Sequence, residues 1–166
     1  MIRVVPMSKS ILASLLLLAA TSACTTIPVP PQTPAGADFL ARNGAAKHVV
    51  TTPSGLQYFV VKAGPASGAR PAPGDTVSFD YEGQLTTGET FDSSYARKQP
   101  LTGAIGQFVP GFDEALGLMR SGDEWIVWIP PQLGYGARAS GPIPGNSVLR
   151  FRLGLHSVAK SASPTG

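Results

Sequence analysis

Apolar and polar residues alternate along several stretches of the chain, which is the pattern of half-buried β-strands. In "TVSFDYEGQL" (residues 76–85) every second residue is apolar, so one face of the strand is expected to be buried and the other wet. The inward set is Val77, Phe79 and Tyr81, and the outward set is Ser78, Asp80 and Glu82. The runs "GLQYFVVKAG" (55–64) and "SVLRFRLGL" (147–155) predict two further strands, the second with Arg150 and Arg152 facing outward.

One stretch, "PGFDEALGLMRSG" (110–122), repeats its apolar residues with the period of an α-helix. The apolar stripe consists of Phe112, Ala115, Leu116 and Met119. Two acidic residues in the first turn and Arg120 in the last suit the helix dipole, and Gly122 is expected to end the helix. The following "EWIVWI" (124–129) is apolar on both faces, which predicts a central strand beneath the helix.

Strands joined by turns, with one helix inserted late in the chain, predict an α+β fold. We expect an antiparallel five-stranded sheet wrapped around one helix, with a single modest core. The segment "TTGE" (86–89) predicts a hairpin turn after the alternating strand, and "GARPAPGD" (68–75) predicts a loop before it.

The stretch "PPQLGYGARASGPIPG" (130–145) is too rich in proline and glycine for a helix or a central strand. It places Tyr135 between two glycines and Ile143 between two prolines. The glycines allow a tight turn around Tyr135, and the prolines stiffen the loop that presents Ile143. A loop of this length inside a compact domain is usually functional, and the alternative is an ordinary surface loop.

The N-terminal segment is unlike the rest of the chain. A basic start at Arg3 and Lys9, the short apolar run "ILASLLLLAA" and small residues before Cys24 predict a signal peptide for export. The alternative is a signal anchor that stays attached, although the apolar run is short for a membrane span.

Cys24 is the only cysteine, so no internal disulfide can form. The sequence "ATSAC" (20–24) is similar to the lipobox of bacterial lipoproteins, with Thr21 where leucine is usual. This resemblance implies lipidation of Cys24, and the alternative is a cleaved signal with an unmodified thiol. Thr25 stands where inner-membrane retention signals have aspartate, which implies a lipoprotein anchored in the outer membrane on its periplasmic side.

A linker is expected between this signal and the globular part. "TTIPVPPQTPAGA" (25–37) predicts an extended, semi-rigid tether, and Asp38 is placed to cap a short helix that Gly44 ends. The expected divisions are a signal peptide (1–24), a Pro-rich tether with a short helix (25–52), a globular domain (53–158) and a flexible tail (159–166).

Composition argues against several function classes. The formal net charge is +3, but Arg3 and Lys9 lie in the signal segment and no basic run follows, so nothing favours nucleic-acid binding. After Cys24 the chain has no cysteine for a metal cluster, no G-x-S-x-G elbow and no glycine loop for phosphate. Hydrolysis, hydride transfer and phosphoryl transfer therefore lack candidates, and no metal or organic cofactor is implied.

Three separated motifs match one family in the same order. They are "FDYEGQLTTGETFDSS" (79–94), "VPGFDEALGLMRSGD" (109–123) and "PPQLGYGA…IPGNSVLRF" (130–151). Together they resemble FKBP-type peptidyl-prolyl cis-trans isomerases, and the resemblance runs from about residue 54 to 157. The preceding "FLARNG…VTTPSGLQY" resembles bacterial exported members, several of which carry an N-terminal helical dimerisation domain. We expect this chain to lack that domain and to be a monomer.

The resemblance implies an apolar pocket between sheet and helix that receives the substrate proline. It implies Asp92, Tyr135 and Phe91 as catalytic residues. It implies substrate-binding roles for Tyr81, Arg97, Leu101, Phe108, Val109, Phe112, Ile143 and Phe151. Arg97 is expected to pair with Asp92, and the Val109 N–H to bind a substrate carbonyl. The alternative for each apolar side chain is simple core packing.

The function implied is rotamase activity that assists the folding of exported proteins by stabilising a twisted X–Pro amide. The alternatives are a chaperone that binds proline-containing segments with little turnover, and a structural envelope lipoprotein. The implied partners are proline-containing exported polypeptides and macrolides of the FK506/rapamycin type. Phe112 stands where the family commonly has tryptophan, and Leu101 where it often has phenylalanine, so weaker binding of such bulky macrocycles is expected.

Overall fold

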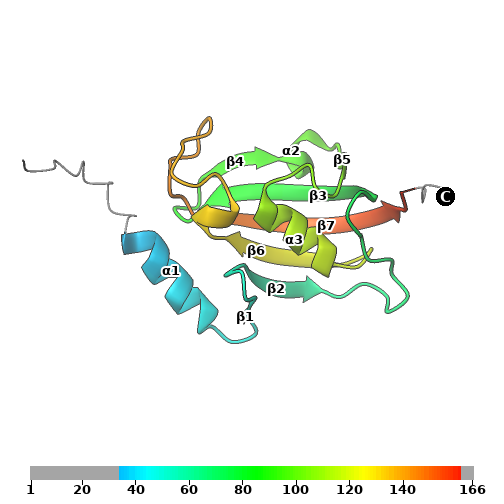
Figure 1. Cartoon of the computed structure of the whole chain (residues 1–166), viewed down its shortest axis with the longest axis horizontal. Helices are drawn as coiled ribbons and strands as arrows, with labels where there is room; N and C mark the ends of the chain where they lie inside the picture. Colours follow the sequence, from blue (N-terminus) through cyan, green and yellow to red (C-terminus); the bar gives the residue numbers. More distant parts are fainter. Residues whose placement is uncertain (1–33, 162–166) are drawn as a thin grey trace, which may run out of the picture.

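A computed structural model describes residues 34–161, and the signal segment with Cys24 lies outside them. Its centre is a seven-stranded antiparallel sheet in the order β1-β2-β6-β7-β3-β4, and β5 pairs with β3. Helix α3 lies across one face of this sheet (Figure 1). The α+β antiparallel architecture predicted from the sequence is therefore confirmed, but the sheet has seven strands and not the expected five.

The helices and strands have the following bounds: α1 (Pro34–Gly44), β1 (Val50–Thr51), β2 (Gln57–Lys62), β3 (Thr76–Leu85), β4 (Thr90–Ser93), α2 (Ser94–Arg97), β5 (Leu101–Ala104), α3 (Pro110–Leu118), β6 (Glu124–Ile129), a 3-10 turn η1 (Pro131–Leu133) and β7 (Leu149–Ala159). None of the helices within residues 34–161 is both long enough and apolar enough to cross a membrane.

The two longest strands, β3 and β7, pair along their whole length, from Thr76 opposite Ala159 to Leu85 opposite Leu149. Burial alternates along both, so the inward side chains pack under α3 and the outward ones meet solvent. The fully buried centre of the core includes Phe79, Leu153 and Leu155. The predicted alternation of both strands is confirmed.

Helix α3 buries the predicted stripe, because Phe112, Ala115, Leu116 and Met119 are all buried. It ends at Leu118, however, and Met119 is already extended with a ψ of 163°. Arg120 therefore lies beyond the helix and cannot act on its dipole. Instead its guanidinium donates to the carbonyls of Ala66 and Gly68, at 3.0 and 3.2 Å. These contacts hold the 63–70 loop against the turn before β6.

The N-terminal helix differs from its expected start. α1 begins at Pro34, so Asp38 lies inside the helix and does not cap it, and the expected extended tether is helical from residue 34 onward. Gln57 on β2 fixes the end of this helix, because its amide donates to the Leu40 carbonyl at 2.8 Å and accepts from Asn43 at 2.8 Å. Figure 1 shows α1 beside the β1–β2 edge of the sheet.

The C-terminal end of the domain is held by Asp75, which is 2% exposed. Its carboxylate accepts hydrogen bonds from the Ala72 N–H at 2.8 Å, the Ser161 N–H at 2.9 Å and the Lys160 ammonium at 2.8 Å. Strand β7 reaches Ala159, and Lys160 and Ser161 are bound to Asp75. The structured part therefore extends past the expected start of the tail.

Asp75 makes stability depend on pH in acid. The Lys160 ammonium, then the N–H groups of Ser161 and Ala72, lower the Asp75 pKa from 3.8 to about 2. Because the folded-state pKa is the lower one, the stabilisation is complete above about pH 4 and is lost as the pH falls toward 2. We expect Asp75→Asn to lower the urea midpoint at pH 7 and to flatten its change between about pH 4 and 2.

The control for this prediction is Asp38→Asn, which changes an exposed carboxylate on α1. The variant should retain the acid dependence of the parent chain. Equal acid dependence in Asp75→Asn and the parent would show that Asp75 does not carry the effect.

Candidate active site

A cleft of about 480 Å³ opens between α3 and the strands on which it packs. Its lining consists of Tyr81, Phe91, Asp92, Leu101, Gln107, Phe108, Val109, Phe112, Tyr135 and Phe151. All but one of these residues are among those singled out in the sequence. Gln107 was missed, because nothing in its local pattern marks a pocket residue.

Phe112 forms the floor of the cleft and is 6% exposed. Its ring contacts Phe108, Phe79 and Phe151 with centroids 5.3, 5.4 and 5.1 Å away, and Tyr81 at 6.3 Å. The contacts with Phe151 and Tyr81 are edge-to-face, which suits the charge distribution of aromatic rings. The floor is therefore rigid and apolar.

The far wall is made by Phe91 and Phe151, whose rings meet edge-to-face at 5.6 Å. They lie over Gly83 of β3. A Cβ at that position would come within 2.5 Å of Phe91 and 2.7 Å of Phe151. Glycine is therefore required at position 83, because any side chain would push both rings away from the sheet.

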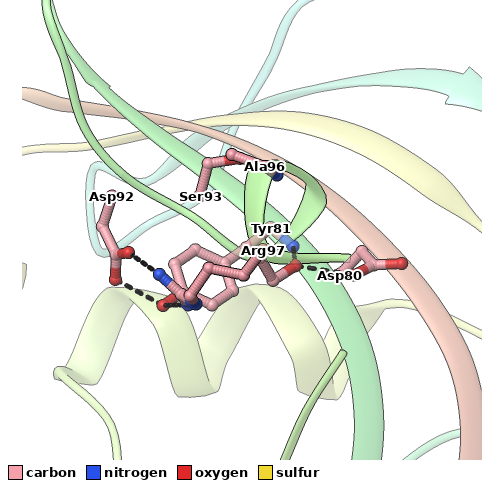
Figure 2. A network of polar contacts seen from close by, with 7 residues as sticks. Asp80, Tyr81, Asp92, Ser93, Ala96 and Arg97 are labelled. Atoms are coloured by element: carbon pink, nitrogen blue, oxygen red, sulfur yellow. Dashed lines mark hydrogen bonds and ion pairs between the residues drawn. The ribbon is translucent and has the colours of Figure 1, made fainter. Parts of the chain in front are cut away.

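The polar edge of the cleft is a network of Tyr81, Asp92 and Arg97 (Figure 2). Asp92 accepts hydrogen bonds from the Tyr81 hydroxyl and from the Arg97 guanidinium, and Asp92 and Arg97 form a salt bridge. Arg97 donates to the Tyr81 oxygen at 2.8 Å, and its guanidinium carbon lies 5.7 Å from the Tyr81 ring centroid. The expected pairing of Arg97 with Asp92 is present.

Local structure brings these three side chains together. Asp92 lies opposite Gly83 in the β3–β4 ladder, and α2 begins directly after β4. The Ser93 hydroxyl caps α2 by accepting from the Ala96 N–H at 3.2 Å, so the single helical turn returns Arg97 to Asp92.

Ser94 ties the same helix to β3. It is fully buried, and its hydroxyl accepts from the Tyr81 N–H at 2.9 Å and donates to Asp80 at 2.6 Å. His156 contacts the other Asp80 oxygen at 2.8 Å. Figure 2 shows Asp80 on the far side of Tyr81 from Asp92. The backbone N–H of the pocket tyrosine is therefore fixed by a serine that Asp80 in turn holds in place.

The network controls the charges at the edge of the cleft. Burial raises the pKa of the Tyr81 hydroxyl, and the hydrogen bond to Asp92 raises it further. For Asp92, burial would raise the pKa, but hydrogen bonds from Tyr81 and Arg97 outweigh it, and the net pKa is lowered. At neutral pH the edge therefore presents a carboxylate that is held by a neutral phenol and a guanidinium.

Val109 precedes α3 and lines the cleft. Among residues 34–161 no acceptor contacts its backbone N–H, which leaves that donor free for a ligand. Asp113 fixes the preceding loop, because its carboxylate accepts from the N–H of Gly106 at 2.8 Å and of Phe108 at 3.2 Å. The geometry is compatible with the expected contact between Val109 and a carbonyl oxygen.

The loop between β6 and β7 provides the rim. The N–H groups of Gly134 and Gly136 both bond to the Pro131 carbonyl, at 3.0 and 2.8 Å, and Gly136 has a φ of +61° that favours glycine. This turn holds Tyr135 over the cleft with 43% of its surface exposed. The expected tight glycine turn is present.

Ile143 lies elsewhere than expected. A short bridge between Ser140 and Ile143 folds the loop back, and Ile143 is 5% exposed within the hydrophobic core. Ile143 is not one of the described residues that line the cleft. In the structure Ile143 therefore anchors the loop, and Phe91 and Phe151 form the wall of the cleft.

The chemistry available in the cleft is binding and orientation. Its lining contains one carboxylate, two phenols and an amide among apolar side chains, and the Arg97 guanidinium binds the carboxylate from beside the cleft. Within residues 34–161 no group of three or more His, Cys, Asp or Glu side chains could hold a metal ion.

Sequence comparison agrees with this geometry. The profile described as FKBP-type peptidyl-prolyl cis-trans isomerase matches residues 68–156. The chain belongs to this family. A second profile, described as the domain amino terminal to FKBP-type peptidyl-prolyl isomerase, matches residues 31–60, which include α1.

Two curated relatives illustrate the similarity. Outer membrane protein MIP of Legionella longbeachae is 43% identical over 128 residues, which are 76% of this chain and 54% of that protein. FkpA of Aeromonas hydrophila is 41% identical over 128 residues, which are 77% of this chain and 47% of that protein. The chain therefore spans about half the length of these two relatives.

Solved FKBP-type structures share the fold. The crystal structure of FkpA from Escherichia coli has a TM-score of 0.72 at 36% identity and covers 76% of this chain and 58% of that one. A peptidyl-prolyl cis-trans isomerase from Pseudomonas syringae has a TM-score of 0.73 at 28% identity and covers 82% of this chain and 99% of that one.

Proposed function

We propose that this FKBP-type chain is a peptidyl-prolyl cis-trans isomerase that assists the folding of exported proteins. The observation that carries the proposal is the gathering of Tyr81, Phe91, Asp92, Phe112 and Phe151 around one apolar cleft. Asp92 and Tyr135 are the residues proposed to orient the substrate, with Phe91 as a wall beside the reacting bond. The substrates proposed are proline-containing exported polypeptides.

The reaction requires no nucleophile. The obstacle is amide resonance, which gives rotation about the peptide bond a barrier of about 18–20 kcal/mol. Twisting the amide removes the resonance and makes the group less dipolar, so an apolar cleft disfavours the planar form relative to the twisted one. Only such differential binding accelerates the step, and lowering the barrier by about 6 kcal/mol would give roughly four powers of ten.

The polar groups complete the site. The free N–H of Val109 is proposed to hold a carbonyl of the substrate chain, and Asp92 to face the twisting amide from the polar edge. Neither group transfers a proton. Tyr135 lines the cleft and is partly exposed, and its hydroxyl is proposed to bond the peptide as it enters.

A protease-coupled assay with an X–Pro peptide tests the proposal. The purified chain should accelerate isomerisation in proportion to its concentration. A rate no greater than that of buffer would overturn the proposal, and peptide binding without acceleration would favour a proline-segment-binding chaperone instead.

Tyr135→Phe removes only the hydroxyl at the rim. We expect kcat/KM to fall about 3- to 10-fold, since one hydrogen bond contributes about 1 kcal/mol. The unfolding midpoint should not change, because the side chain is largely exposed. If kcat/KM were unchanged, the Tyr135 hydroxyl would have no part in binding the peptide.

We also propose that the chain works in the cell envelope as a lipoprotein anchored through Cys24. The lipobox-like "ATSAC" supports this, as does the name of the similar outer membrane protein MIP. Radioactive fatty acid should label the parent chain and not Cys24→Ser. Equal labelling of both would overturn the anchor and leave the isomerase proposal standing.

A further inference from the structure

Gly103 of β5 lies at the tip of the Phe108 ring. A Cβ at position 103 would be 2.6 Å from the tip of that ring, closer than real Cβ contacts come, and 3.4 and 3.5 Å from the adjacent ring atoms. Gly103 does not have a positive φ, so its backbone conformation does not require glycine. Space for the ring is therefore the reason for glycine at this position.

The other sides of the Phe108 ring are also occupied. Phe79 meets it edge-to-face at 5.5 Å, and Phe112 lies 5.3 Å away at a tilt of 47°. The backbone cannot follow a displaced ring easily, because the Phe108 N–H is bonded to Asp113. The remaining direction is the cleft, which Phe108 lines.

We propose that Gly103 and Phe108 form a size-matched pair that sets the width of the cleft and so selects among prolyl peptides. This inference rests on the proposed isomerase function. Because Gly103 has no side chain, the Phe108 ring can pack against β5. This position leaves room in the cleft for a bulky side chain next to the substrate proline. Gly103 is a positioning residue in this pair, because it acts through Phe108.

Two peptides that differ only in the residue before proline, Ala–Pro and Leu–Pro, test the pair in the isomerase assay. Gly103→Ala should push the ring into the cleft and lower kcat/KM for the Leu–Pro peptide about tenfold relative to the Ala–Pro peptide, as expected for a change of about one methylene in an apolar pocket. Phe108→Val, which shortens the side chain, should raise kcat/KM for the Leu–Pro peptide relative to the Ala–Pro peptide.

The combined variant Gly103→Ala/Phe108→Val separates this effect from a general loss of structure. Val at position 108 removes the atoms that a new Cβ would meet, so the Leu–Pro to Ala–Pro ratio should recover at least to that of the parent. Gly117→Ala is the matched control, because a Cβ at Gly117 meets nothing within 4 Å, and it should leave the ratio unchanged. The proposal would be overturned if Gly103→Ala left the Leu–Pro to Ala–Pro ratio unchanged. It would also be overturned if the combined variant did not restore that ratio.

Unfolding by urea gives a readout that does not depend on activity. Gly103→Ala should lower the midpoint when position 108 is Phe and should change it little when position 108 is Val. If the parent chain lacked isomerase activity, the proposed function would fail. The dependence of the Gly103→Ala stability loss on the residue at position 108 would still show whether Gly103 makes room for the Phe108 ring. Equal effects of Gly103→Ala in both backgrounds would remove the steric pairing itself.

Discussion

Asp92→Asn is expected to lower kcat/KM for X–Pro isomerisation about 10- to 100-fold and to leave stability nearly unchanged. The substitution keeps the size of the side chain and removes the charge that binds the Tyr81 hydroxyl and Arg97. Asp92 is proposed to face the twisting amide, and interactions with a charged group contribute about 1.5–3 kcal/mol, which corresponds to this range of rates. The measurement is kcat/KM in the protease-coupled assay, together with the urea midpoint.

Stability should be spared because the ion pair is near the surface. The side chains of Arg97 and Asp92 are 48% and 42% exposed, and exposed pairs contribute about 0–1 kcal/mol to folding. An effect on activity alone would therefore show that the network serves the cleft. A loss of stability as large as the loss of activity would instead indicate a structural pair.

Glu124→Gln is the matched control for Asp92→Asn. Glu124 forms a similar ion pair with Arg152, whose side chains are 25% and 48% exposed, and neither residue lines the cleft. This variant should keep the kcat/KM of the parent chain. If it lost as much activity as Asp92→Asn, the effect would be one of surface charge and not of position.

The long elements of the fold were predictable from periodicity, whereas the short ones were not. Strand β3 and the apolar stripe of α3 follow a period over enough residues to bury one face. Strands β4 and β5 have four residues each, which is too short for a period to appear. They form because β3 offers them an edge, through a local hairpin for β4 and, for β5, through pairs such as Thr76 opposite Ala104 that lie far apart in the chain.

The pocket side chains could be named from motifs, but their supports could not. Asp92 and Tyr135 lie in stretches that resemble the family, so their positions were expected. The local sequence does not reveal the supporting residues, because each acts on a residue from another segment. Ser94 binds the Tyr81 N–H, Gly83 makes room for the Phe91 and Phe151 rings, and Gly103 makes room for the Phe108 ring. The end of α3 was also misjudged, because Arg120 binds loop carbonyls and not the helix terminus.

Phe112→Ala should produce the largest loss of stability, about 3–5 kcal/mol, because it removes a buried ring from between the cleft and the core. The Phe112 ring contacts the rings of four other aromatic residues, which are Phe79, Tyr81, Phe108 and Phe151. Without it, the floor of the cleft is missing and the surrounding rings lose their support. Activity should therefore fall more steeply than in Asp92→Asn, measured at a temperature where the variant is folded.

Two further substitutions show which part of this loss belongs to the cleft. Phe112→Leu keeps an apolar floor and should recover most of the stability and part of the activity. Phe59→Ala also removes a phenylalanine ring, from the β2 face opposite Tyr58, and should lower stability modestly without changing kcat/KM. If Phe59→Ala impaired kcat/KM as much as Phe112→Ala did, activity would depend on general stability, and Phe112 would have no particular place beneath the substrate.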